Sequence, residues 1–186
     1  MQFPLKYKCL QNEVYTDSVY ALKAIRFDDK DKIRQWRNDQ IDILRQKEIL
    51  TSAQQDHYFS TQVFPLFFEE NPKQVLFSFF ENGVLIGYGG LVHINLSDKN
   101  AEISFLLYTK RNSVSDYLEL FGYYLVLIQK VAVDLGLHKI FSYGYDLEKY
   151  RFEPLVKSNY HHEALLKDHV KIKGIFYDVK IYAKIL

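Results

Sequence analysis

Asp116 and Glu119 stand three residues apart at the start of a long apolar run, a spacing typical of a capping box at the beginning of a helix. Just before them, residues 101–108 are short, β-branched and aromatic, as expected of a strand that is buried on both faces. Free backbone N–H groups and the helix dipole both favour negative charge at the amino end of a helix. This succession of strand, turn and helix therefore predicts a site for an anionic group.

A second set of side chains suited to binding lies in two helices expected nearer the amino terminus. Arginine pairs well with phosphate or carboxylate, and tryptophan can stack on a base or a sugar. The set comprises Arg34, Trp36, Arg37, His57 and Tyr58. A tryptophan three residues after Ile33 also fits a core position, with the arginines as a solvated flank, and the sequence leaves both interpretations open.

Histidines and the single cysteine give no sign of a metal centre. His161, His162 and His169 have no cysteines or further carboxylates at ligand spacing, so no metal site is expected. Cys9 alone cannot form an internal disulfide, which fits a reducing compartment.

The composition is that of an ordinary globular chain. Its 186 residues are 48% hydrophobic and 25% charged, which predicts one domain over residues 1–186, with an added arm or strand at 1–18. A formal net charge of +1 gives no electrostatic reason to expect nucleic acid or a membrane as a partner. No apolar run has the length of a membrane span, and a cytoplasmic monomer or homodimer is expected.

Residue patterns place strands and helices in a mixed order along the chain. Residues 19–27 read as a strand, Asp28-Asp29 as a helix cap, and residues 52–55 as a second capping box. Asn82-Gly83 between 75–80 and 84–96 is a strong hairpin signal, and Lys173-Gly174 joins a second strand pair. Apolar residues at helical spacing predict a helix at 116–135 that ends at Gly136. These elements indicate an α/β layer fold with a mostly antiparallel sheet.

Three blocks of sequence together resemble the GNAT acetyltransferase superfamily. They are AEISFLLYTKRNSVSDYLELFGYYLVLIQKVAVDLGLHKI (101–140), IRQWRNDQIDILRQKEILTSAQQDHYF (33–59) and VKSNYHHEALLKDHVKIKGIFYDVKIYAKIL (156–186). They are similar to the branch with ribosomal-protein N-terminal acetyltransferases and nucleotide-amino-sugar acetyltransferases. The resemblance covers roughly residues 19–186. It implies a GNAT fold with about seven strands and helices on both faces.

The resemblance also implies an activity, the transfer of an acetyl group from acetyl-CoA to a primary amine. Such a transfer needs a neutral amine, a polarised thioester carbonyl and a proton for the departing thiolate. Glu102 is the expected base, directly or through water, and His93 is the second choice. The usual tyrosine proton donor falls on Leu155, so Tyr145 and Tyr150 are the expected substitutes. The expected acceptor is a small amine, with a nucleotide-linked amino sugar favoured over a peptide amino terminus, bound by the set that begins at Arg34.

The implied cofactor contacts follow the strand and the turn into the long helix. They are Phe105, Leu106, Leu107, Lys110, Arg111, Ser113, Ser115 and Tyr117. The family's glycine-rich turn is absent from RNSVSDYLELFG, whose first glycine is Gly122. Carboxylates at 116 and 119 would compete with a pyrophosphate for the helix N–H groups. The alternative function is therefore a degenerate GNAT domain that does not bind CoA and acts as a non-catalytic binding module.

Overall fold

The computed structural model describes residues 2–186 and contains one eight-stranded sheet, in the order β1-β2-β3-β4-β5-β6-β8-β7. Within these described residues, β5 and β6 form the one parallel pair, and all other neighbours are antiparallel. The strands are β1 (Val14–Asp17), β2 (Tyr20–Ala24), β3 (Val75–Glu81), β4 (Val84–Asn95), β5 (Asn100–Leu107), β6 (Lys139–Tyr145), β7 (His161–Ile172) and β8 (Ile175–Ile185). The sheet confirms the predicted fold class, with eight strands in place of about seven.

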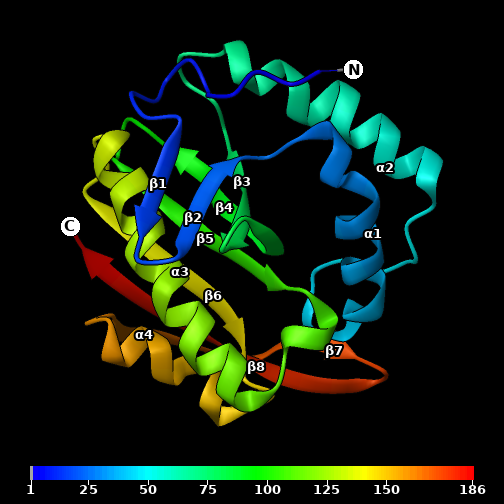
Figure 1. Cartoon of the computed structure of the whole chain (residues 1–186). Helices are drawn as coiled ribbons and strands as arrows, with labels where there is room; N and C mark the ends of the chain where they lie inside the picture. Colours follow the sequence, from blue (N-terminus) through cyan, green and yellow to red (C-terminus); the bar gives the residue numbers. More distant parts are fainter. Residues whose placement is uncertain (1) are drawn as a thin grey trace.

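Helices cover both faces of this sheet (Figure 1). One face carries α1 (Lys30–Asp39) and α2 (Ser52–Tyr58), and the other carries α3 (Val114–Asp134) and α4 (Glu153–Lys157). After α2 the chain continues as a π-helical turn, Phe59–Val63, and a 3-10 turn, Phe64–Phe68, with Pro65 at its start. Proline has no N–H to donate and is tolerated in a first turn, so it begins this segment where the sequence predicts a kink or an end.

Both predicted hairpins are present. Asn82 and Gly83 have φ of 48° and 78° between β3 and β4, and Lys173 and Gly174 have φ of 47° and 88° between β7 and β8. Two successive positive φ values define the two-residue turn whose twist matches that of the flanking strands. These short-range signals therefore set the register of both strand pairs.

Two helix starts differ from prediction by one or a few residues. The cap of α2 is Thr51, whose hydroxyl accepts from the Gln54 N–H while the Gln54 side chain accepts from the Thr51 N–H. The capping box therefore spans 51–54, not 52–55. Helix α3 begins at Val114, and its cap is Ser113. The Asp29 carboxylate before α1 makes no capping bond, because it accepts from the Arg26 side chain instead.

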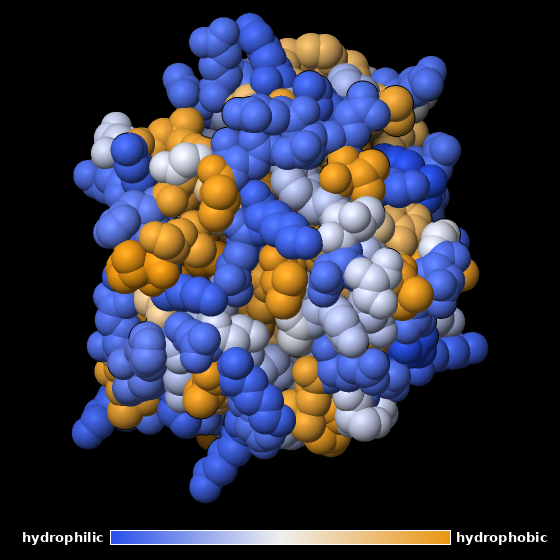
Figure 2. Space-filling view, turned by 60° about the vertical axis from the view of Figure 1, so that its left-hand side comes forward, coloured by the Kyte–Doolittle hydropathy of each residue, from blue (hydrophilic) through white to orange (hydrophobic). Residues whose placement is uncertain are grey.

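The buried face of α3 matches the periodicity in the sequence. Its buried positions include Phe121, Tyr124, Leu125, Ile128, Val131 and Ala132. Burying six such side chains is the main stabilising contribution of this helix, at roughly 1.5–3 kcal/mol for each large one. On the outer face shown in Figure 2, hydrophobic residues form small groups separated by hydrophilic ones.

The amino-terminal arm packs into the same core. Tyr7 is fully buried, stacks on Phe67 with ring centroids 4.1 Å apart, and donates to the Leu76 carbonyl at 3.1 Å. At the end of α3, the Asp134 carboxylate accepts from the Gln11 N–H and the Tyr15 hydroxyl. The predicted arm thus contains β1 and is tied to both faces; its first residue lies outside the described residues.

Candidate active site

The sheet opens between β5 and β6. Their parallel pairing ends at Ile103 and Ser142, although β5 runs on to Leu107 and β6 to Tyr145. A cavity of about 280 Å³ fills the resulting wedge. Its walls include the ends of β5 and β6 that no longer pair with each other, the loop after α1 and the start of α3. A wedge between two strands exposes backbone groups and side chains together, as a binding site requires.

Glu102 lies at the closed end of the wedge and is 9% exposed. The Arg45 guanidinium donates from Nη2 to Glu102 Oε1 at 2.7 Å. From Nη1 the same guanidinium contacts Nε2 of His93 at 3.2 Å. A guanidinium only donates, so the imidazole nitrogen accepts. Arg45 therefore joins the two predicted bases, which are themselves 3.8 Å apart.

His93 owes its position to a break in the sheet. The register of β4 and β5 shifts between Val92 and Asn95, and His93 has φ of 51°. Such a bulge redirects one side chain out of the regular alternation, and positive φ is uncommon for a residue other than glycine. The local strain therefore turns the imidazole toward Arg45. His93 does not line the cavity itself; it lines an open groove of about 900 Å³ that shares Val92 with the cavity.

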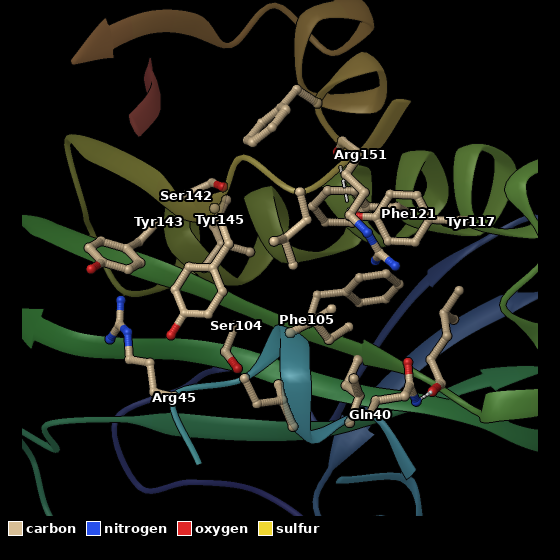
Figure 3. A pocket seen from close by; sticks show the side chains of 18 of the residues that line it. Gln40, Arg45, Ser104, Phe105, Tyr117, Phe121, Ser142, Tyr143, Tyr145 and Arg151 are labelled. Carbon is tan, nitrogen blue, oxygen red and sulfur yellow. Dashed lines mark hydrogen bonds between the residues drawn. The ribbon is translucent and has the colours of Figure 1, made fainter. Parts of the chain in front are cut away.

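Tyrosines from β6 form the side of the cavity next to Arg45. The Arg45 guanidinium lies 4.0 Å from the ring centroid of Tyr143, and Tyr145 lies between this pair and Ser104 (Figure 3). Burial raises the pKa of Tyr145, and the neighbouring Tyr143 raises it further. The Tyr145 hydroxyl is therefore protonated at neutral pH and can donate its proton.

The other predicted proton donor, Tyr150, does not line the cavity. Its hydroxyl donates to Glu148 Oε2 at 2.7 Å, and its ring packs edge-on against Tyr117. Leu155, where the family's tyrosine falls, lines the cavity but has no proton to give. Of the two substitutes, the structure brings only Tyr145 to the wedge.

The far end of the cavity is aromatic. Phe105 of β5 stacks on Phe121 of α3 at 4.6 Å, and Tyr117 packs against both rings. The Arg151 guanidinium lies 5.0 Å from the Tyr117 ring centroid, and the two side chains lie next to each other in Figure 3. Burial raises the pKa of Tyr117 well above its ordinary value, so this wall is uncharged apart from Arg151.

The amino end of α3 departs from the predicted arrangement. The Ser113 hydroxyl, not a carboxylate, accepts from the Asp116 N–H at 3.1 Å. The Asp116 carboxylate accepts from the Ser113 hydroxyl and from Arg111 Nε. It therefore blocks no helix N–H group. The prediction that carboxylates cap this helix is wrong, although their negative charge stays close to it.

Arg111 is fully engaged beside this helix. It donates to Glu81 Oε2 at 2.7 Å as well as to Asp116. The Ser113 hydroxyl and then the Arg111 guanidinium lower the pKa of Asp116, and Arg111 is the main cause of the lowered pKa of Glu81. The carboxylates of Glu81 and Asp116 thus neutralise the positive charge of Arg111, the one arginine of this turn.

The remaining predicted cofactor residues divide into two groups. The wedge side chains Phe105, Leu106, Leu107 and Tyr117 line the cavity. The side chains of the turn do not line the cavity; these are Lys110, Arg111, Ser113 and Ser115. Asn112, which the sequence did not single out, lines the cavity from the same turn.

Only one member of the predicted acceptor set lines the cavity. Arg37 does so, and it donates to the Tyr88 hydroxyl at 2.7 Å and to Gln46. Trp36 is 3% exposed and stacks on Tyr108, as its core interpretation requires. The others, Arg34, His57 and Tyr58, lie outside the cavity wall.

Several cavity residues escaped the sequence-based prediction. Arg45, Gln40, Tyr143 and Arg151 are the polar or charged ones that stand out in Figure 3. Gln40 donates to the Leu107 carbonyl at 2.8 Å and so ties the loop after α1 to β5. Gln40 follows Trp36 by four residues and so lies on the same face of the helix, one turn further along. This spacing could have indicated Gln40 from the sequence. Nothing local marks the others.

Residues 2–186 contain no cluster of three or more histidine, cysteine or acidic side chains able to hold a metal ion. Within the same residues no helix is both long and apolar enough to cross a bilayer.

Residues 22–179 match the family model described as an acetyltransferase (GNAT) domain. The chain belongs to the GNAT acetyltransferase family. This membership confirms the predicted family and the predicted enzyme class, an acyl-CoA-dependent N-acetyltransferase with acetyl-CoA as its cosubstrate.

Solved structures with the same fold include several GNAT enzymes. Spermidine N-acetyltransferase from Vibrio cholerae in complex with CoA and spermine is 17% identical, with 91% of this chain and 96% of that chain covered and a TM-score of 0.77. RimL, a ribosomal L7/L12 α-N-protein acetyltransferase in complex with coenzyme A, is 12% identical, with 93% and 98% covered and a TM-score of 0.79. An N-acetyltransferase from Staphylococcus aureus Mu50 is 16% identical, with 90% and 99% covered and a TM-score of 0.69. No curated protein matches the sequence.

Proposed function

We propose that this GNAT domain acetylates a primary amine of a small acceptor at the Glu102 end of the wedge, with acetyl-CoA entering from the α3 end. The observation that carries the proposal is the end of β5–β6 pairing at Ile103 and Ser142. Beyond it, the β6-facing edge of β5 can pair with the amides of a pantetheine arm. The cavity of about 280 Å³ suits the thioester arm and the amine, and leaves the nucleotide part outside.

The chemistry follows from the groups at each end. The amine nitrogen attacks the thioester carbonyl, a C–N bond forms and the C–S bond breaks. Glu102, directly or through water, takes the proton that the amine loses. The Tyr145 hydroxyl gives a proton to the departing thiolate, since its raised pKa keeps it protonated. His93, 65% exposed in its side chain, is the second choice of base.

The acceptor remains a small amine in this proposal. A nucleotide-linked amino sugar is preferred over a peptide amino terminus because of the sequence similarity around Trp36, Arg37 and Asn38. The position of Arg37 in the cavity wall supports this preference. Trp36 takes no direct part, since it is buried in the core.

The test combines cosubstrate binding with turnover. Calorimetry measures acetyl-CoA affinity, and thiol release measures transfer to a panel of primary amines. In Glu102→Gln the rate should fall on the order of 10²-fold or more while acetyl-CoA affinity persists. Glu13→Gln, an exposed carboxylate elsewhere, is the matched control.

Two results would contradict the proposal. Full activity of Glu102→Gln across the pH profile would remove this residue from the mechanism. No acetyl-CoA binding at millimolar concentration would instead identify the chain as a non-catalytic binding module.

A further inference from the structure

Positive charge dominates the cavity wall. Among the residues that line it, the charged side chains are three arginines and one carboxylate: Arg37, Arg45, Arg151 and Glu102. An acceptor with a second ammonium group would meet cations and a carboxylate that already has a partner. An acceptor with an anionic group would meet arginines, which bind phosphate and carboxylate in a bidentate fashion.

Only one of the three arginines is free to exchange partners. Arg37 is held by the Tyr88 hydroxyl and Gln46. Arg151 donates to Glu148 Oε2 at 2.9 Å and is 16% exposed in its side chain. Arg45 is 48% exposed in its side chain and lies in the irregular segment between the 3-10 turn Ile41–Ile43 and α2.

Arg45 also occupies both groups expected to accept the amine proton. It donates to Glu102 Oε1 and to His93 Nε2 at the same time. The Tyr143 ring supports the guanidinium from one face. While Glu102 Oε1 accepts from the guanidinium, that oxygen is not open to the amine, and the bond must be exchanged first.

We propose that Arg45 binds an anionic group, phosphate or carboxylate, on the acceptor itself, and that this exchange releases Glu102 to act as base. The inference rests on the proposed function and names its substrate class: a small molecule that carries a primary amine and an anion. It makes Arg45 a specificity-determining residue. A neutral amine would leave Arg45 on Glu102, and a polyamine would find no free carboxylate on the described cavity wall.

Matched acceptors test this class. Ethanolamine, O-phosphoethanolamine and β-alanine each place two carbons between the amine and a neutral, phosphate or carboxylate group, and spermidine represents polyamines. In the native protein, kcat/KM for the preferred anionic acceptor should exceed that for ethanolamine by at least about tenfold. Which of the two anions is preferred distinguishes phosphate from carboxylate recognition.

Substitution of Arg45 should remove the preference. In Arg45→Gln the ratio between anionic and neutral acceptors should fall to about one, and Arg45→Lys should keep part of it because the charge remains. Lys47→Gln, an exposed cation in the same segment, should keep the full ratio. A ratio that survives in Arg45→Gln, or a native preference for spermidine, would overturn the proposal.

A binding measurement keeps the test independent of turnover. With CoA present, calorimetry should detect O-phosphoethanolamine or β-alanine more tightly than ethanolamine, and Arg45→Gln should lose the difference. Equal binding of all three by the native protein would refute the acceptor class. Failure of the proposed function looks different, because then acetyl-CoA itself does not bind or no amine, charged or neutral, releases CoA thiol.

Discussion

The Tyr124 hydroxyl donates a hydrogen bond of 2.8 Å to the backbone carbonyl of Ser104. This bond joins the centre of α3 to β5 at the first residue beyond its pairing with β6. Gly89 of β4 makes the approach possible, since a Cβ there would lie 2.5 Å from the Tyr124 hydroxyl and 2.1 Å from the Ser104 oxygen. The shape of the wedge therefore depends on a glycine in the neighbouring strand.

Gly89→Ala should destabilise the protein by about 1–3 kcal/mol, as overpacking of a filled core does. The atoms in the way are largely backbone and cannot move aside. Gly122→Ala is the matched control, because a Cβ at that position in α3 meets nothing within 4 Å. It should stabilise by about 0.5–1 kcal/mol, the usual gain over glycine in a helix. Urea unfolding of both variants measures the difference, and equal stability would contradict the steric argument.

Tyr145→Phe should lower kcat on the order of 10²-fold with little change in acetyl-CoA affinity, because it removes the proton for the thiolate. Burial raises the pKa of Tyr145, so its deprotonation should limit the native rate only above the ordinary tyrosine value of 10.0. The measurement is kcat against pH. Tyr150→Phe removes the other predicted donor, and if that variant alone loses activity, the assignment belongs to Tyr150.

Asp116→Asn combined with Glu119→Gln should tighten acetyl-CoA binding by about 3- to 10-fold. Each carboxylate near the amino end of α3 repels a pyrophosphate by a fraction of 1 kcal/mol, and neither forbids binding. In the native protein the affinity should be high-micromolar or weaker. Calorimetry at two salt concentrations gives the check, since the gain should shrink as salt screens the charges. Nanomolar native affinity would contradict this interpretation of the turn.

Arg111→Gln should destabilise the protein at neutral pH and less in acid. The Arg111 guanidinium lowers the pKa of Glu81 below its ordinary 4.5. A lowered pKa in the folded protein contributes stability above the ordinary value, and the contribution is lost as pH falls through the folded value. The Tm difference between native protein and variant should therefore be largest near pH 7 and should narrow below pH 4.5. A constant difference from pH 7 to pH 3 would assign the effect to packing.

Local patterns predicted most of the fold. The periodicity of α3 and the turns at Asn82-Gly83 and Lys173-Gly174 are encoded within a few residues, and the structure has them. Two of the predicted catalytic residues, Glu102 and Tyr145, line the cavity. Errors arose where two polar residues within one turn of each other could serve as a cap: Ser113 replaces Asp116, and Thr51 replaces Ser52.

The charge arrangement of the site could not be predicted in this way. Arg45 lies in a segment without periodicity, and its partner Glu102 is 57 positions away. The bulge that turns His93 toward Arg45 depends on how β4 and β5 align, which no short stretch of either strand reveals. Tertiary pairing therefore decides which of the six arginines of the chain line the cavity.

The wedge leaves the sheet unfinished. Two antiparallel parts, β1–β5 and β6–β8, are joined along their common edge by only four residue pairs, from Asn100–Lys139 to Ile103–Ser142. A bound arm with amide groups can add hydrogen bonds to these edges as a strand would. The sheet is then completed by a molecule that leaves in each turnover. We therefore expect the sheet to be stiffer while the arm is bound and the reacting atoms must be held, and to loosen as the product departs.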